Sequence, residues 1–111
     1  IIHVNRGAEA TILADDVTVG HAAIIHACTL ERRAFVGMGA TVLDGAVIED
    51  GGVLAAGGVL PPGKRIGRME LWMGNPAKLV QVLTEERRAG FDRTATHYVE
   101  LAGRHRASLS N

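Results

Sequence analysis

The feature that most constrains the fold of this chain is a period of six residues between positions 13 and 60. Each unit begins with an aliphatic residue, at Leu13, Val19, Ile25, Leu30, Val36, Val42, Ile48, Leu54 and Leu60, with one unit shortened to five residues. Four residues after the first eight of these lies a small or β-branched residue, at Val17, Ala23, Thr29, Ala34, Ala40, Ala46, Gly52 and Gly58. A hexapeptide period is typical of a parallel β-helix. The large aliphatic residue then fills the interior of a narrow coil, and the small residue fits where space is tight.

Other folds do not match this period. A β-sandwich shows turn signals every ~8–12 residues, and a buried helix has a period near 3.6 residues. The chain has only two Phe, one Tyr and one Trp, so its core must be aliphatic. The sequence therefore predicts an all-β fold, a parallel β-helix built from hexapeptide coils.

The rest of the chain divides around these coils. We expect a strand at residues 1–4, a loop around Gly7 at residues 5–11, coils at residues 12–60 that end at Pro61-Pro62-Gly63, and a strand-and-turn passage at residues 64–83. Thr84 reads as a helix N-cap, with Glu85 and Glu86 in the first turn, where the helix dipole favours them. The predicted units are a β-helix at 1–83 and a C-terminal helix at 84–106 that packs on the outside of the coil. Its cationic residues, Arg87, Arg88, Arg104 and Arg106, are interpreted as a solvated face.

Composition narrows the functional class. The formal net charge is zero, which gives no reason to expect a nucleic-acid partner or a membrane surface. The single Cys28 excludes an intrachain disulfide and favours a reducing, cytoplasmic compartment. The chain opens inside a strand-like segment, and a stack of repeats needs a covered end. We therefore expect further coils upstream in a longer protein.

Three histidines are the candidate metal ligands. His3 and His26 each follow a core-facing isoleucine, so both side chains should point outward. Counting back one coil from Ile25, with the loop insertion, leads to Ile2, which predicts that His3 and His26 stack on one face about 5 Å apart. His21 belongs to the preceding face of the same coil. A neighbouring chain could supply it, and three-fold packing would repeat such a site at each interface.

Several segments together resemble the gamma-class carbonic anhydrases. They are Val17-Thr18-Val19-Gly20-His21, Ile25-His26-Ala27-Cys28-Thr29, Gly37-Met38-Gly39-Ala40, Pro61-Pro62-Gly63-Lys64, Gly74-Asn75-Pro76-Ala77-Lys78 and Leu83-Thr84-Glu85-Glu86. The resemblance implies a left-handed β-helix with a C-terminal helix, assembled as a homotrimer. It implies that His3 and His26 bind metal together with His21 of the adjacent subunit, and that Tyr98 reaches toward the active site as a catalytic residue.

The implied reaction is reversible hydration of carbon dioxide to bicarbonate. Zinc, or iron(II) or cobalt in some members, lowers the pKa of bound water to about 7, and the hydroxide on the His3-coordinated metal attacks carbon dioxide. The chain departs from the family pattern in two places. The family's Arg, Asp and Gln upstream of the first histidine would precede Ile1, and Arg6 stands where the prototype has a proton-shuttling Glu.

Two other classes stay open at the level of sequence. Hexapeptide-repeat acyltransferases share the fold and the Gly-Asn-Pro-Ala-Lys turn, and use coenzyme A with a single catalytic histidine; a related thioesterase would act on coenzyme A esters. The paired Ile-Ile-His segments, at residues 1–3 and 24–26, favour the metal site over these. The third class is a trimeric scaffold protein with weak or no activity.

Overall fold

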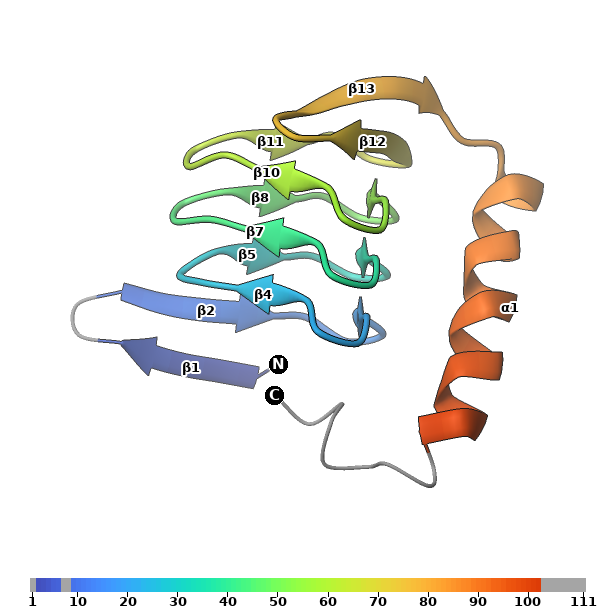
Figure 1. The fold of residues 1–111 in the computed structure, drawn as a ribbon, viewed down its shortest axis with the longest axis horizontal. Coiled ribbons are helices and arrows are strands. Elements are labelled where there is room, and N and C mark those ends of the chain that lie inside the picture. Colours follow the sequence, from blue (N-terminus) through green and yellow to red (C-terminus); the bar gives the residue numbers. More distant parts are fainter. Residues whose placement is uncertain (1, 7–8, 103–111) are drawn as a thin grey trace.

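The computed structural model describes the backbone of residues 2–6 and 9–102 and the side chains of residues 11–93. Short strands wind into stacked coils, and one helix runs beside the stack (Figure 1). The strands are β1 Ile2–Arg6, β2 Glu9–Leu13, β3 Thr18–Val19, β4 Ile24–Ile25, β5 Thr29–Leu30, β6 Phe35–Val36, β7 Thr41–Val42, β8 Val47–Ile48, β9 Val53–Leu54, β10 Val59–Leu60, β11 Arg65–Ile66, β12 Glu70–Gly74 and β13 Ala77–Val82. The helix is α1, Glu85–Ala102.

Three sheets form the walls of the coil. The first wall has the strand order β1-β2-β5-β8-β11, the second β13-β12-β9-β6-β3 and the third β10-β7-β4. Within each wall the coil strands pair in parallel, and in the first wall Leu13 faces Leu30, which faces Ile48. The repeat is therefore 17 residues in the lowest coil and 18 in the next, because the five-residue unit after Ile25 lies in that lowest coil.

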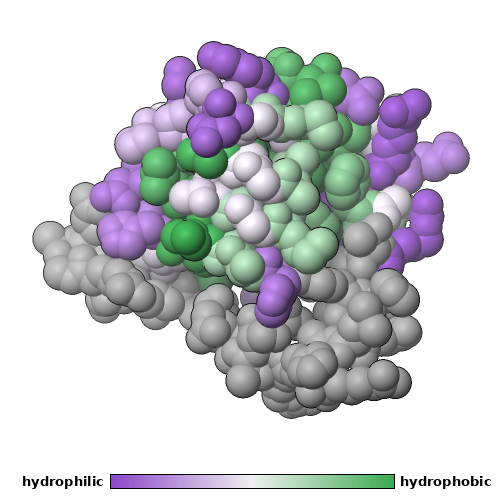
Figure 2. Space-filling view, viewed as in Figure 1, coloured by the Kyte–Doolittle hydropathy of each residue, from purple (hydrophilic) through white to green (hydrophobic). Residues whose placement is uncertain are grey.

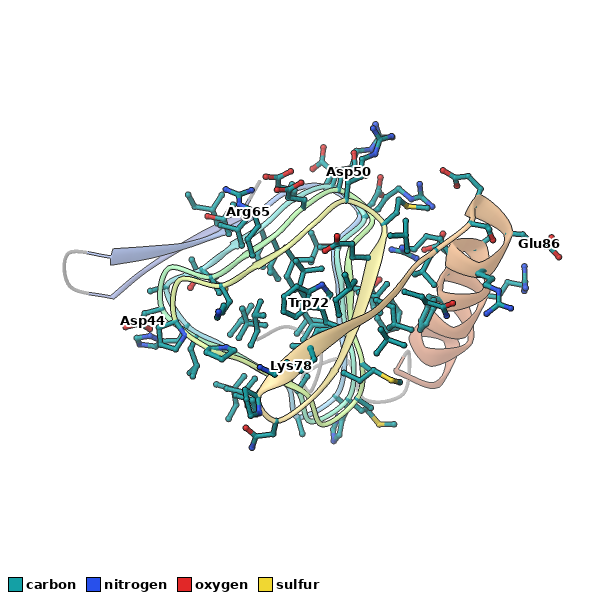
Figure 3. The ribbon with its side chains drawn as sticks, turned by 90° about the horizontal axis from the view of Figure 1, so that it is seen from above. Asp44, Asp50, Arg65, Trp72, Lys78 and Glu86 are labelled. Atoms are coloured by element: carbon teal, nitrogen blue, oxygen red, sulfur yellow. The ribbon has the colours of Figure 1, made fainter. Side chains whose placement is uncertain are left out.

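The aliphatic residue that opens each unit fills the interior, as the period predicts. Seven of these side chains are fully buried, Leu30, Val36, Val42, Ile48, Leu54, Leu60 and Ile66. Trp72 continues the inner column above Leu54 and lies inside the outline of the coil when the molecule is seen from above (Figure 3). In one unit, the residue at the small-residue position of the repeat differs from the predicted Thr29. Buried Cys28, and not Thr29, occupies it, because the short unit moves this position one residue toward the N-terminus.

Every corner of the coil contains a residue with positive φ. These residues recur every six residues, with one step of five between Ala22 and Ala27. They are Asp16, Ala22, Ala27, Arg33, Gly39, Gly45, Gly51, Gly57, Gly63 and Met69. The chain turns tightly there, and the following amide bonds back to the carbonyl three residues earlier, as in Ala46 N to Leu43 O at 3.1 Å. Glycine adopts this left-handed conformation without steric strain, whereas other residues do so at a cost.

The two ends of the coil correct the predicted boundaries. Pro61-Pro62-Gly63 does not end the coils, because β11 and β12 continue them in the first and second walls. The amide of Leu43, at the equivalent corner below, donates to Leu60 O in the coil above at 3.1 Å. β10 is the last strand of the third wall, so the amide that Pro61 lacks would have no strand above to bond.

At the N-terminal end, residues 1–4 do not form a strand of a regular coil followed by a loop. β1 and β2 pair antiparallel, with His3 opposite Ile12 and Arg6 opposite Glu9. Only two residues separate these strands, and a connection that short returns the chain along the edge of the same sheet, whereas a parallel pairing needs a long crossover.

The predicted helix N-terminus is confirmed. Thr84 accepts a hydrogen bond from Arg87 N through its hydroxyl oxygen at 3.1 Å, and Glu85 and Glu86 lie in the first turn. The helix packs on the second wall, where Leu83 and Phe91 join the buried side chains Phe35, Val53 and Leu71. Among the described residues, no helix is long and apolar enough to cross a membrane.

Arg88 corrects the interpretation of the helix as a solvated cationic face. Its side chain is 1% exposed and lies over the ring of Phe35, 5.9 Å from the ring centroid. The guanidinium donates to Gly51 O at 2.9 Å, to Arg33 O, and to the Asp92 carboxylate at 2.8 Å. Arg33 and Gly51 are positive-φ corner residues of adjacent coils, so Arg88 joins the helix to the coil corners.

Candidate metal centre

The outer surface of the third wall is poor in charge. Three segments build this wall and its two corners, residues 20–27, 37–45 and 55–63, and Asp44 is the only Asp, Glu, Lys or Arg among them. Ile24 and Met38 are large apolar side chains exposed here, at 59% and 55%. The face turned to the viewer in Figure 2 carries mostly apolar and weakly polar residues across these strands. The other corners carry charges instead, for example Asp16 with Arg32 at 3.9 Å.

His21 and His26 lie at opposite borders of this third wall. His21 is exposed in the corner between β3 and β4, and its carbonyl accepts a hydrogen bond from Gly39 N at 2.9 Å. His26 follows β4 directly, and its amide donates to Val42 O at 3.0 Å. The strand between them keeps the two imidazoles apart within one chain, since an extended chain rises about 3.3 Å per residue.

The His26 side chain has a partner one coil away. Its Nδ1 hydrogen-bonds Oδ1 of Asp44, eighteen residues later, with both side chains about half exposed. Because one ring nitrogen is engaged by the carboxylate, Nε2 is the atom left for a ligand. This contact of Asp44 with His26 was not predicted from the sequence. The signal was present, because a spacing of eighteen residues equals one coil.

His3 does not lie where the coil count predicts. β1 belongs to the first wall and runs antiparallel to β2, whereas β4, which precedes His26, belongs to the third wall. The prediction that His3 and His26 stack on one face, one coil apart, is therefore wrong in this structure. The count assumed a parallel coil at residues 1–4, and the short connection to β2 gives a hairpin instead. The His3 side chain lies outside the described residues.

Tyr98 lies in α1, in the part of the helix whose side chains are outside the described residues. The structure therefore gives no contact that tests its predicted catalytic role. The helix itself packs on the second wall, while His21 and His26 border the third.

Within the described part of the chain, no three His, Cys, Asp or Glu side chains lie close enough to hold a metal ion. The positions of His21 and His26 explain this for a single copy. If a second copy packs against the third wall around a three-fold axis, its His21 border can meet the His26 border of the first copy, which is the head-to-tail geometry of a closed ring. Imidazoles with one nitrogen held by an acceptor suit zinc, iron(II) and cobalt. The donor chemistry present therefore fits the metal that the sequence predicts, at a contact between chains.

Cys28 does not belong to this donor set. Burial raises the pKa of its thiol to about 11, and the thiolate is the form that binds metals or reacts as a nucleophile. The side chain fills the small-residue position beside Leu30 and Ala46 in the core. We assign Cys28 a packing role.

No protein-family model matches the chain. Gamma carbonic anhydrase 1 of Arabidopsis thaliana mitochondria is 47% identical over 97 residues, which are 87% of this chain and 35% of that protein. A protein of Methanocaldococcus jannaschii named "Probable carbonic anhydrase" is 46% identical over 102 residues, 92% of this chain and 64% of that protein. The predicted resemblance to gamma-class carbonic anhydrases is thus confirmed, and the chain spans between about a third and two thirds of the length of these two relatives.

Solved structures share the fold. The crystal structure of a hexapeptide transferase family protein from Anaplasma phagocytophilum matches with a TM-score of 0.70 and 43% identity, covering 83% of this chain and 60% of that one. This similarity, together with the three walls of parallel coil strands and the C-terminal helix, confirms the predicted fold class, a left-handed parallel β-helix of hexapeptide repeats.

Proposed function

We propose that this chain, a homologue of the gamma carbonic anhydrases, forms a homotrimer that hydrates carbon dioxide to bicarbonate at metal sites between its subunits. The proposed ligands are His26 of one subunit and His21 of the next, with one metal ion per chain. The resemblance to gamma carbonic anhydrases adds His3 of the first subunit as the third ligand, although the pairing of β1 with β2 does not stack it over His26. The observation that carries the proposal is the pair of histidines at opposite borders of a wall that contains no Lys or Arg. A residue set of this kind is incomplete in one chain and becomes complete when copies pack side by side.

The third wall has the features of a surface that is buried against another subunit. Two large apolar side chains, Ile24 and Met38, are exposed on it, and contiguous apolar surface marks contacts between proteins. The resemblance to gamma carbonic anhydrases supports a trimer, whose three copies would each contribute one wall. Burying these side chains would add about 25 cal/mol per Å² of apolar area to the association.

A zinc, iron(II) or cobalt ion at this place supplies a strong nucleophile from water at neutral pH. The residues of the chain would hold the metal ion in place and exclude bulk water from it. His26, held through Asp44, would present Nε2 at the border of the wall. The apolar residues around it would restrict access of bulk water and suit a small uncharged substrate. Tyr98 is proposed to reach toward this centre from the helix of a subunit. A cytoplasmic location also stays a prediction.

The test combines metal content, oligomeric state and activity. Sedimentation of the unaltered chain should give a trimer, elemental analysis should find one metal ion per chain, and stopped-flow measurement should detect hydration of carbon dioxide. His26→Ala should lose the metal and the activity together, and His105→Ala, a histidine outside the proposed set, should keep both. A stable monomer that retains metal, or an unchanged metal content in His26→Ala, would overturn the shared site.

A second candidate is acyl transfer from coenzyme A, favoured by the similarity to the hexapeptide transferase family structure. Calorimetric titration with coenzyme A separates the two, since the carbonic anhydrase proposal requires no coenzyme A binding. A metal-bearing trimer without hydration activity and without coenzyme A binding would favour the scaffold role.

A further inference from the structure

We propose that Asp44 is a positioning residue for the metal: it fixes the tautomer and the orientation of His26 so that Nε2 faces the ligand site. This inference rests on the proposed metal site and goes beyond it, because Asp44 would not touch the metal. The observation is the hydrogen bond from His26 Nδ1 to the Asp44 carboxylate. A carboxylate that accepts the Nδ1 proton leaves the lone pair on Nε2, and it also makes the imidazole a stronger ligand.

The backbone of Asp44 is held firmly enough to serve this purpose. Its carbonyl accepts a hydrogen bond from Gly63 N at 3.0 Å in the coil above. The next residue, Gly45, donates from its amide to Ala27 O at 2.8 Å in the coil below. The coil below is the one that carries His26. The carboxylate and the imidazole are therefore presented from adjacent layers of one rigid stack, with their spacing set by the coil repeat.

The local charge also favours this pairing. Asp44 is the only Asp, Glu, Lys or Arg in the segments that build the third wall. Among the described residues, its one ion-pair partner is His26. Within the part of the chain whose side chains are described, no ion pair with another cation competes with His26 for this carboxylate. Surface corner residues elsewhere in the coil do have such partners, as Glu49 has Arg65 at 2.5 Å.

The chain contains a matched control in Asp50. Asp44 and Asp50 both precede a positive-φ glycine, Gly45 at 74° and Gly51 at 71°. The carbonyl of Asp50 accepts from Met69 N at 3.1 Å, as that of Asp44 accepts from Gly63 N. The two residues occupy different corners of the coil, as the view from above shows (Figure 3). Replacing either therefore makes the same backbone and charge change, and only one of them lies beside His26.

The experiment uses the full chain and two measurements. The first is the ring-nitrogen chemical shifts of His26 in the metal-free protein, from long-range proton–nitrogen correlation, which report the tautomer. The second is zinc affinity by competition with a chelating dye. The variants are Asp44→Ala, Asp44→Asn and Asp50→Ala, with sedimentation to verify that each keeps the oligomeric state of the unaltered chain.

We expect the proton on Nδ1 in the unaltered chain and a shift toward the Nε2–H form in Asp44→Ala. The same variant should bind zinc about 10- to 100-fold more weakly, the usual effect of removing such a partner. Asp44→Asn keeps an acceptor oxygen, so it should keep the tautomer and lose less affinity, while Asp50→Ala should match the unaltered chain. Undiminished zinc affinity in Asp44→Ala, or an Nε2–H tautomer in the unaltered chain, would overturn the role of Asp44. Failure of the unaltered chain to bind zinc would instead overturn the proposed metal site, and the role of Asp44 with it.

Discussion

The lower coils, residues 11–33, and the upper coils, residues 34–66, follow one repeat but differ in their corner residues and in the burial of their interior side chains. All of the positive-φ corners of the upper coils are glycine, from Gly39 to Gly63. Those of the lower coils are Asp16, Ala22, Ala27 and Arg33. The interior differs in the same sense. The aliphatic residues that open the units of the upper coils are fully buried. In the lower coils Leu13, Val19 and Ile25 are only partly buried, and Leu30 is fully buried.

The difference in corner residues places the candidate site where the backbone is strained. A non-glycine residue in the left-handed conformation costs about 1 kcal/mol. The lower coils carry four such residues together with His21 and His26, and they also hold the shortened unit. The upper coils, which carry Asp44, then act as the regular layer on which the histidine-bearing layer is built. Strained backbone often lies near functional sites in this way.

The largest expected effect tests the difference in the core. Leu54→Ala removes a fully buried side chain from the upper coils and should lower the free energy of unfolding by about 3 kcal/mol, since burial and the residual cavity both count. Leu13→Ala makes the same change in the lower coils and should cost about 1 kcal/mol. Urea unfolding followed by circular dichroism measures both. Equal losses would mean that the two regions are packed alike.

Arg88→Met examines how the helix connects the two regions. Arg88 binds the carbonyl of Arg33 in the lower coils and that of Gly51 in the upper coils. The substitution leaves these carbonyls without their hydrogen-bond donor and should lower the free energy of unfolding by about 2 kcal/mol. Arg87→Met, at an exposed neighbouring position, is the control and should change stability by less than about 0.5 kcal/mol. Thermal unfolding of the two variants decides the matter, and a similar melting temperature for both would contradict the role assigned to Arg88.

The smallest effect exchanges corner residues within one column. Ala22 and Gly39 occupy equivalent corners in adjacent coils, and a Cβ at Gly39 meets nothing within 4 Å. Gly39→Ala should therefore destabilise by about 1 kcal/mol through backbone strain alone. Ala22→Gly should stabilise by about 0.5 kcal/mol, because relief of strain outweighs the extra freedom of glycine in the unfolded chain. Chemical denaturation with the double variant tests additivity, and a destabilised Ala22→Gly would remove the argument that lower corners are strained.

The sequence predicted the parts of the fold that depend on a repeated local pattern. The interior column, the outward direction of His26 and the Thr84 cap follow from period and residue type. The errors arose where a residue depends on the coil above or beside it. Arg88 looks solvated on a helix considered alone, and the pairing of β1 depends on the competition between a hairpin and a coil.

The candidate site was predictable to the same degree. The residue types and the separation of His21 from His26 could be read from the spacing of the units. The role of Asp44 could not be recognised from its own corner alone, because it depends on His26, which lies one coil below. For a β-helix, residues one coil apart are as close as sequence neighbours, and motifs should be sought at that spacing too.

The prolines at the last corner of the third wall have a consequence for how the molecule behaves in a crowded solution. A stack of coils presents unpaired backbone groups at its final layer, and such an edge can template the addition of strands from another molecule. Pro61 removes an amide donor from that edge, and β13 folds back over β12 on the neighbouring wall. Linear growth of the stack into a fibre is therefore opposed at this end by the residues that complete the coil itself.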